Sequence, residues 1–223
     1  MSTPPPKRYE DVAPWPPEGE LDLPSLLSGG GPIEIDVGIG RGMSLFERAA
    51  AAPDSRILGI EIKQKWAYRV EQRRLRLGLD RVRVFAGDAR SILRRSGPDG
   101  CVQRAFLHFP DPWWKKRHAK RRVVAPDLLD MFGRLLRAGG ELFLQTDVQE
   151  RADDYLRLLR AHPLFEVPAP GGFTANNPFG ARSNRERRAG EDGLPVYRIL
   201  ALRVGGAAAE GGAHERPQGE EDQ

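Results

Sequence analysis

The chain has 223 residues, of which 39% are hydrophobic and 30% charged, with a formal net charge of +4 at pH 7. This length suits one substantial domain and hardly two, and the basic balance favours a polyanionic partner. A single cysteine excludes a disulfide framework, and there is no apolar run of the ~18 residues that a membrane helix requires. We therefore expect a cytoplasmic protein.

The two ends differ in composition from the middle of the chain. Residues 1–25 are rich in proline, and residues 205–223 are rich in glycine, alanine and acidic side chains. Such segments bury too little apolar surface to offset the entropy of ordering them. We predict a flexible segment over 1–25, one folded domain over 26–204 and a disordered acidic tail over 205–223.

Short apolar runs alternate with amphipathic segments of helical length. The runs predict strands over 33–37, 57–62, 82–86, 105–109 and 141–146. Helices are predicted over 43–52 and 64–77, from Pro126 to a stop at Gly139–Gly140, and from Asp147 onward. The alternating pattern of residues 196–204 predicts an antiparallel or edge strand.

This order of elements predicts a Rossmann-like, doubly wound α/β fold. The sheet is expected to be mostly parallel, with helices on both faces and an antiparallel strand near the C-terminus. Ligands of such sheets bind beyond the C-terminal ends of the strands, so the residues that follow each strand are the candidate site.

The first strand ends in "DVGIGRG", in which Asp36 precedes glycines that include Gly38 and Gly40. Glycines let the backbone turn tightly and approach a ligand, while the following helix presents free N–H groups. The spacing misses the G-x-G-x-x-G pattern of dinucleotide sites, which weakens the case for NAD. A tight turn that binds nothing is the alternative.

Acidic residues end the next three strands. Glu61 is placed to accept both hydroxyls of a ribose, or to pair with Lys63 or Lys65. Asp88 can accept from an adenine amine, or cap a helix. With Asp36 and Asp111, these acids outline a crevice for adenosine that lacks basic residues for phosphates except Arg41. S-adenosylmethionine, which is a cation without phosphates, is therefore the preferred cofactor.

The stretch "FPDPWWKKRHAKRR", residues 109–122, follows the fourth strand. The prolines on both sides of Asp111 restrict the backbone and hold the acid in place. The two tryptophans can stack on bases or pack in the core. The six Lys and Arg residues repel one another unless a polyanion such as RNA relieves the repulsion, although an ordinary solvated face is the alternative.

This stretch resembles the signature of the bacterial tRNA (guanine-N7-)-methyltransferases, which methylate the guanine at position 46 in the tRNA variable loop. The resemblance runs from about Ile33 to Val204 and includes "DVGIGRG", "GIEIK", "GDA", "LQTD" and "SNRERRAGEDGLPVYRI". It implies a class I S-adenosylmethionine-dependent methyltransferase.

The resemblance also implies roles for individual residues. Asp111 is the expected catalytic acid, and the cofactor-binding residues are Asp36, Gly38, Gly40, Glu61, Asp88 and Asp111. The target nucleoside is expected to contact Lys115, Asp147, Ser183, Asn184, Arg185 and Glu186. The tRNA is expected to contact Arg117, His118, Ala119, Lys120, Arg121 and Arg122.

Asp36 and the motif at 183–186 depart from the family pattern, and Asp147 has an alternative role. Asp36 stands where the family usually has Glu, and "SNRE" at 183–186 stands where it commonly has T-x-F/Y-E. Asp147, with Glu150 three residues later, can instead form a helix capping box.

The predicted reaction leaves other classes open. A non-catalytic RNA-binding protein with a relic pocket and an NAD-dependent Rossmann oxidoreductase are the alternatives. The four histidines are scattered and the cysteine is alone, so the sequence predicts no metal site. We expect tRNA as the partner, no membrane association, and a monomer or homodimer.

Overall fold

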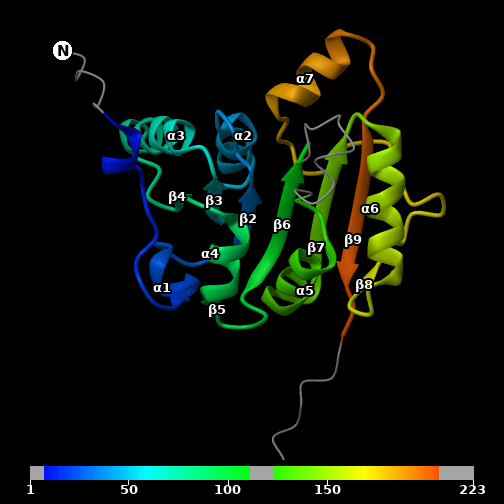
Figure 1. The fold of residues 1–223 in the computed structure, drawn as a ribbon, viewed down its shortest axis with the longest axis horizontal. Helices are drawn as coiled ribbons and strands as arrows, with labels where there is room; N and C mark the ends of the chain where they lie inside the picture. The colour runs from blue at the N-terminus through cyan, green and yellow to red at the C-terminus, as the bar shows by residue number, and fades with distance from the viewer. Residues whose placement is uncertain (1–7, 111–122, 206–223) are drawn as a thin grey trace, which may run out of the picture.

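The computed structural model describes residues 8–110 and 123–205, and its main element is a seven-stranded sheet in the order β4-β3-β2-β6-β7-β9-β8 (Figure 1). The strands are β2 (Ile33–Val37), β3 (Arg56–Glu61), β4 (Val82–Ala86), β6 (Val102–His108), β7 (Leu136–Thr146), β8 (Phe165–Glu166) and β9 (Tyr197–Arg203). Strands β2, β3, β4, β6 and β7 pair in parallel, whereas β9 is antiparallel to β7 and β8. The predicted fold class is confirmed.

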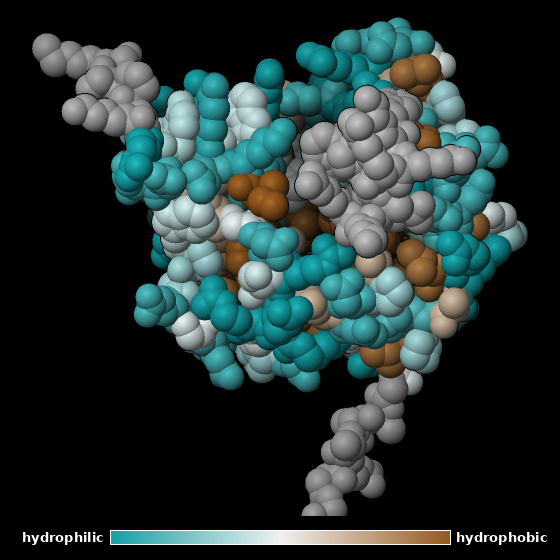
Figure 2. All heavy atoms as spheres, in the orientation of Figure 1, coloured by the Kyte–Doolittle hydropathy of each residue, from teal (hydrophilic) through white to brown (hydrophobic). Residues whose placement is uncertain are grey.

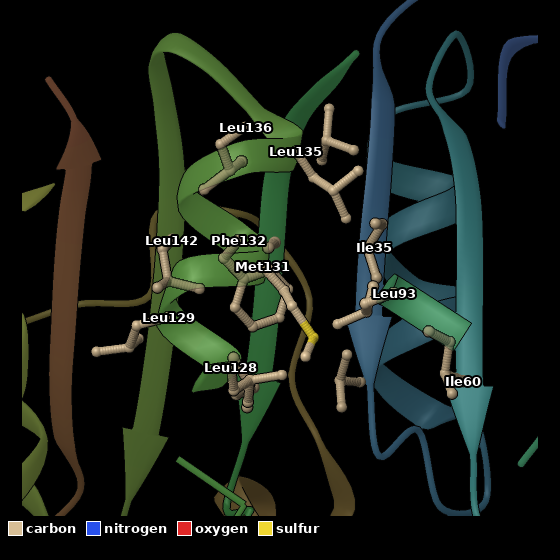
Figure 3. Close-up of a cluster of buried hydrophobic side chains, with 14 of the residues drawn as sticks. Ile35, Ile60, Leu93, Leu128, Leu129, Met131, Phe132, Leu135, Leu136 and Leu142 are labelled. Atoms are coloured by element: carbon tan, nitrogen blue, oxygen red, sulfur yellow. The ribbon is translucent and has the colours of Figure 1, made fainter. Parts of the chain in front are cut away.

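Helices cover both faces of this sheet. They are α1 (Leu23–Leu26), α2 (Met43–Ala51), α3 (Gln64–Arg76), α4 (Ala89–Arg95), α5 (Pro126–Leu135), α6 (Gln149–Ala161) and α7 (Asn184–Glu191), with a short 3-10 helix, η1 (Tyr9–Asp11). The apolar side chains of α4, α5 and α6 share one core with the sheet, and those of α2 and α3 share another. Figure 3 shows the first core, in which α5 points Leu128 and Phe132 at the sheet opposite Ile35 of β2.

The strand order places the candidate site. From β2 the chain proceeds to β3 and β4 on one side, and then returns to β6 and β7 on the other. The C-terminal ends of β2 and β6 therefore flank the point where the direction of winding reverses, which is where ligands of open α/β sheets bind.

One face of the sheet carries a buried ionic network beneath the site. Glu34 of β2 is fully buried, and its carboxylate accepts from Arg48 of α2 at 2.7 and 2.6 Å. It also accepts from Ser55 at 3.0 Å and from Arg104 of β6 at 3.1 Å. Arg104 in turn donates to Glu141 of β7 at 2.5 Å. The network joins three neighbouring strands to α2.

The helix from Pro126 ends earlier than the sequence predicts. It stops at Leu135, and β7 begins at once with Leu136, which pairs with Val102. A side chain at Gly140 would lie 2.9 Å from the Arg137 carbonyl oxygen and 3.1 Å from that of Gln103. Gly140 thus serves a close approach of two backbones within the sheet, whereas a Cβ at Gly139 would meet nothing within 4 Å. The interpretation of the two glycines as a helix stop was wrong, because α5 ends at Leu135.

The structured part of the chain also begins before the predicted boundary at residue 26. Leu21 and Leu23 are buried, and the short strand β1 (Leu21–Asp22) pairs with β5 (Ser96–Gly97). Earlier, the Ala86 amide donates to the Pro14 carbonyl at 2.8 Å. The expectation of flexibility is therefore wrong for the described residues 8–25. Residues 1–7 and 206–223 lie outside the described part, so flexibility there stays a prediction.

The surface is mainly hydrophilic on the face drawn in Figure 2, where hydrophobic residues show in small groups and inside a hollow near the centre. Within residues 8–110 and 123–205, no helix combines the length and the apolar character needed to span a bilayer.

The ionic network yields a stability prediction. The substitution Glu34→Gln removes the charge that balances Arg48 and Arg104, so it should lower the free energy of unfolding by about 3–5 kcal/mol. The exposed pair of Arg8 with Glu10 is the matched control, because Glu10→Gln should cost less than about 1 kcal/mol. Equilibrium denaturation in urea measures both changes in the free energy of unfolding. Equal changes for the two substitutions would contradict the proposed contribution of the network to stability.

Candidate active site

A cavity of about 560 Å³ opens at the C-terminal ends of β2, β6 and β7. Its walls come from the turn after β2, the ends of β6 and β7, and the start of α7. The lining residues are Gly38, Ile39, Gly40, Arg41, Met43, Ser44, His108, Phe109, Thr146, Asp147, Val148, Ser183, Asn184, Arg185 and Arg188. Segments far apart in the sequence therefore meet at the place that the topology predicts.

The glycine turn after β2 is open toward this cavity. Gly38, Gly40 and Gly42 all have positive φ angles, of 78°, 55° and 77°. A Cβ atom at Gly38 or Gly40 would meet nothing within 4 Å, whereas one at Gly42 would lie 2.9 Å from Val70. The first two glycines thus leave room for a ligand at the backbone, and the third serves packing.

Glu61, at the end of β3, holds the glycine turn in place. Its carboxylate accepts from the amides of Gly40 and Lys63, each at 2.8 Å. No ion pair of Glu61 with Lys63 or Lys65 is recorded in the described part of the chain. Each carboxylate oxygen retains a lone pair for a ribose hydroxyl.

The next residue, Ile62, is 65% exposed although it is large and apolar. An apolar surface beside the acid that is predicted to bind a ribose suits a purine ring. The sequence analysis missed Ile62, and its position directly after the acid at the end of a strand was the available signal.

Asp88 lies outside the lining of the cavity. It is exposed and caps α4, where its Oδ1 accepts from the Ser91 amide at 3.0 Å. The capping alternative raised by the sequence is therefore what the structure contains.

Asp36, in β2 before the glycine turn, lies outside the lining of this cavity and lines a smaller cavity with Ser44 and His108. It is 3% exposed, and its Oδ2 accepts from Ser44 Oγ at 3.0 Å. Oδ1 is buried without a hydrogen-bond partner in the described residues. Burial raises the pKa of the Asp36 carboxyl above its ordinary value, against the opposing effects of His108 and Ser44. An unpaired buried carboxylate oxygen is suited to receive a cationic group.

His108 and Gln145 add a polar pair that the sequence analysis did not select. His108 Nδ1 donates to Gln145 Oε1 at 2.9 Å, and Gln145 Nε2 is buried without a partner in the described residues. The sequence contains only a weak indication of this pair, because the pairing depends on the register that places the two residues side by side on β6 and β7.

Asp147 lies at the end of β7 and is paired with α7. Arg185 Nη2 donates to Asp147 Oδ2, and both residues line the cavity. The alternative of a helix capping box at Asp147 is not observed, because α6 begins at Gln149 with Val148 at its N-cap. The carboxylate thus faces the cavity instead of a helix end.

The motif "SNRE" divides between the cavity and the supporting structure. Ser183 caps α7 by accepting from the Glu186 amide at 3.1 Å, and Ser183, Asn184 and Arg185 line the cavity. Glu186 is buried outside the lining, where it accepts from Arg198 of β9 at 2.9 Å and from Asn177 at 3.3 Å. Its side chain therefore fastens α7 to the sheet.

The backbone is strained where β6 enters the signature stretch. Phe109 has a φ of 54°, the one positive value at a non-glycine residue in the described part of the chain. Such strain at a bulky residue is characteristic of functional sites. The residues that follow Pro110, namely Asp111, Lys115, Arg117, His118, Ala119, Lys120, Arg121 and Arg122, lie outside the described residues.

Metal and thiol chemistry find no support in the described residues. They contain no group of three or more His, Cys, Asp or Glu side chains placed to hold a metal ion. Burial raises the pKa of the Cys101 thiol to about 11, which disfavours the reactive thiolate.

Comparison with known proteins connects this site to methyl transfer. Residues 30–199 match the family model described as "Putative methyltransferase". The chain is 40% identical over 169 residues to a tRNA (guanine-N(7)-)-methyltransferase of Synechococcus sp. (strain JA-3-3Ab), covering 76% of this chain and 71% of that protein.

Two solved structures share the fold at low sequence identity. An rRNA methylase from Streptococcus thermophilus has a TM-score of 0.53 at 14% identity, covering 82% of this chain and 92% of its own. A SAM-dependent O-methyltransferase from Thermotoga maritima has a TM-score of 0.52 at 18% identity, covering 93% and 69%.

The environment of Asp36 yields a prediction that separates stability from binding. Because burial raises the pKa of Asp36 on folding, ionisation of this carboxyl lowers the free energy of unfolding; the cost is complete above the folded-state pKa, declines as the pH falls through that value, and is absent below the unfolded-state pKa. Asp36→Asn should therefore raise the free energy of unfolding at pH 7 by about 1 kcal/mol while it weakens S-adenosylmethionine binding. Denaturation at pH 7 and pH 4, with calorimetric titration of the cofactor, tests both parts. A variant that is less stable than the wild type at pH 7 would contradict the first.

Proposed function

Because this chain belongs to the tRNA (guanine-N7-)-methyltransferase family, we propose that its target is the variable-loop guanine at position 46 and that its cavity holds both the methyl donor and that base. The reaction transfers a methyl group from S-adenosylmethionine to N7 of guanine in tRNA. The observation that carries the assignment of the site is that a glycine turn and Asp147 line one cavity, beside the strand that leads to Asp111.

The glycine turn fits the methyl donor. Gly38 and Gly40 leave open space at the backbone, Glu61 is placed for ribose hydroxyls, and Ile62 offers an apolar surface to the adenine. The unpaired oxygen of Asp36 is suited to a cationic part of the donor. We assign Asp88 to the adenine amine, for which Oδ2 is available while Oδ1 caps α4. S-adenosylmethionine supplies an activated methyl group on a sulfonium.

The reaction requires mainly that the protein align the two reactants and stabilise the charge that forms. Guanine N7 already carries a lone pair, so no proton has to leave it before attack, and catalysis rests mainly on proximity and orientation. A carboxylate can accept from guanine N1–H and the N2 amine and stabilise the cationic purinium that forms. We assign this role to Asp111 with Asp147, while Lys115, Ser183 and Asn184 contact the nucleoside.

Glu186 is assigned an indirect role. Its buried carboxylate holds Arg198 and Asn177, and so keeps the first turn of α7 at the mouth of the cavity.

Cationic side chains beside the cavity support a polyanionic substrate. The guanidinium carbons of Arg41 and Arg69 lie 4.9 and 5.4 Å from the centroid of Trp66, and Lys65 Nζ lies at 5.8 Å. Within the described residues, none of these three cations is in an ion pair. We propose that they meet the tRNA backbone together with residues 117–122.

The activity is tested by transfer of labelled methyl from S-adenosylmethionine to an unmodified tRNA transcript. We expect label on a transcript with guanine at position 46 and none on a matched transcript with adenine there. Mild cleavage at N7-methylguanosine should release the label. Equal labelling of both transcripts would overturn the proposed position, and tRNA binding without any label would favour a binding protein that lacks activity.

A second prediction concerns Asp111. The substitution Asp111→Asn keeps the shape of the side chain but removes the charge that stabilises the purinium, so turnover should fall by about 100-fold or more. Binding of tRNA should change little, as measured by filter retention at fixed salt. Normal methylation by this variant would exclude the proposed mechanism.

A further inference from the structure

The ion pair of Asp147 with Arg185 joins two residues of very different exposure. The Asp147 side chain is 10% exposed and lies at the end of β7, whereas that of Arg185 is 41% exposed and lies in the first turn of α7. Arg185 Nη2 donates to Asp147 Oδ2 inside the cavity. The two partners thus meet at the place assigned to the target base.

Arg185 and the target guanine offer Asp147 similar hydrogen-bond donors. A guanidinium presents parallel N–H donors that fit the two oxygens of a carboxylate. Guanine presents a similar pair along its Watson–Crick edge, through N1–H and the N2 amine. The structure records one such bond, from Arg185 Nη2 to Asp147 Oδ2. A base bound through both carboxylate oxygens would need this oxygen, so Asp147 cannot bind both partners fully at once.

The difference in exposure decides which group can leave. A largely buried carboxylate is costly to leave without a partner. The arginine, which is partly in water already, can extend into solvent at little cost. A guanidinium that remained beside the base would also repel the positive charge that forms on the purine.

We propose that Arg185 is the exchangeable counter-ion of Asp147, replaced by the Watson–Crick edge of the target guanine. The proposal rests on the assignment of Asp147 to the target nucleoside. It makes Arg185 a specificity-determining residue, because a base must offer two donors to displace the guanidinium. Inosine offers only one, since it lacks the N2 amine.

The test compares Arg185→Leu with Arg187→Leu. Arg187 lies on the same helix with a side chain that is also 41% exposed, but it pairs with Glu47 and does not line the cavity. Both variants lose one positive charge near the tRNA, so their comparison cancels the general loss of attraction. Thermal unfolding of both variants verifies that they are folded, and Arg185→Lys serves as a second variant that keeps the charge.

We expect the KM of Arg185→Leu for the guanine transcript to be about two- to fivefold lower than that of Arg187→Leu, as for loss of a partly exposed ion pair. With inosine at the target position, the kcat of Arg185→Leu should rise relative to the control, because no guanidinium has to be displaced. Arg185→Lys should lie between the wild type and Arg185→Leu, since an ammonium lacks the paired donors.

Other results would overturn the exchange. A higher KM or a lower kcat for guanine in Arg185→Leu than in Arg187→Leu would mean that Arg185 holds the substrate. Identical behaviour of the two leucine variants would remove its role in specificity. Asp147→Asn separates this failure from that of its premise, because normal methylation by this variant would overturn the role of Asp147 itself.

Discussion

The buried carboxylate of Glu34 is the interaction on which the arrangement of the site depends. It accepts hydrogen bonds from Arg48, Ser55 and Arg104, and so fixes α2 and β6 relative to β2. Arg48 also donates to the carbonyl oxygen of Phe179 at 3.0 Å. This one carboxylate, with Arg48, therefore positions both the strands below the cavity and the segment that leads to α7. A charge pair of this burial is retained only where its geometry is satisfied on all sides.

On the same face of the sheet, the rows of side chains change from ionic to aromatic to polar as the strands approach the cavity. The row of Glu34, Arg104 and Glu141 is followed by a row with Phe106 and Phe143, against which Phe179 packs edge-on at 5.1 Å. The next row brings His108 beside Gln145 at the cavity. Asp36 of β2 is in register with Phe106 in the aromatic row and lines a small cavity with Phe106 and Phe179, so one buried carboxyl stands within this layer in a medium of low dielectric.

Local patterns predicted the parallel strands, because strands buried on both faces read as continuous apolar runs. The acids at their ends followed from the topology rule. Contacts between distant segments could not be predicted in this way. Arg185 meets Asp147 only because α7 is docked by Glu186 onto Arg198 of β9, and no local pattern encodes that docking. The glycines after α5 misled for a related reason, since their role is set by the backbone of β6.

The position of β9 has a consequence for the order in which the molecule is assembled during synthesis. β9 is inserted between β7 and β8, and its Arg198 binds the Glu186 that anchors α7. Until residues 197–203 leave the ribosome, β7 has a bare edge and α7 has no anchor, although the half of the domain that surrounds the glycine turn is already complete. A nascent chain would thus complete the glycine turn first and dock α7 last. Premature release would yield a protein in which the glycine turn is in place but Ser183 and Asn184 are not held at the cavity.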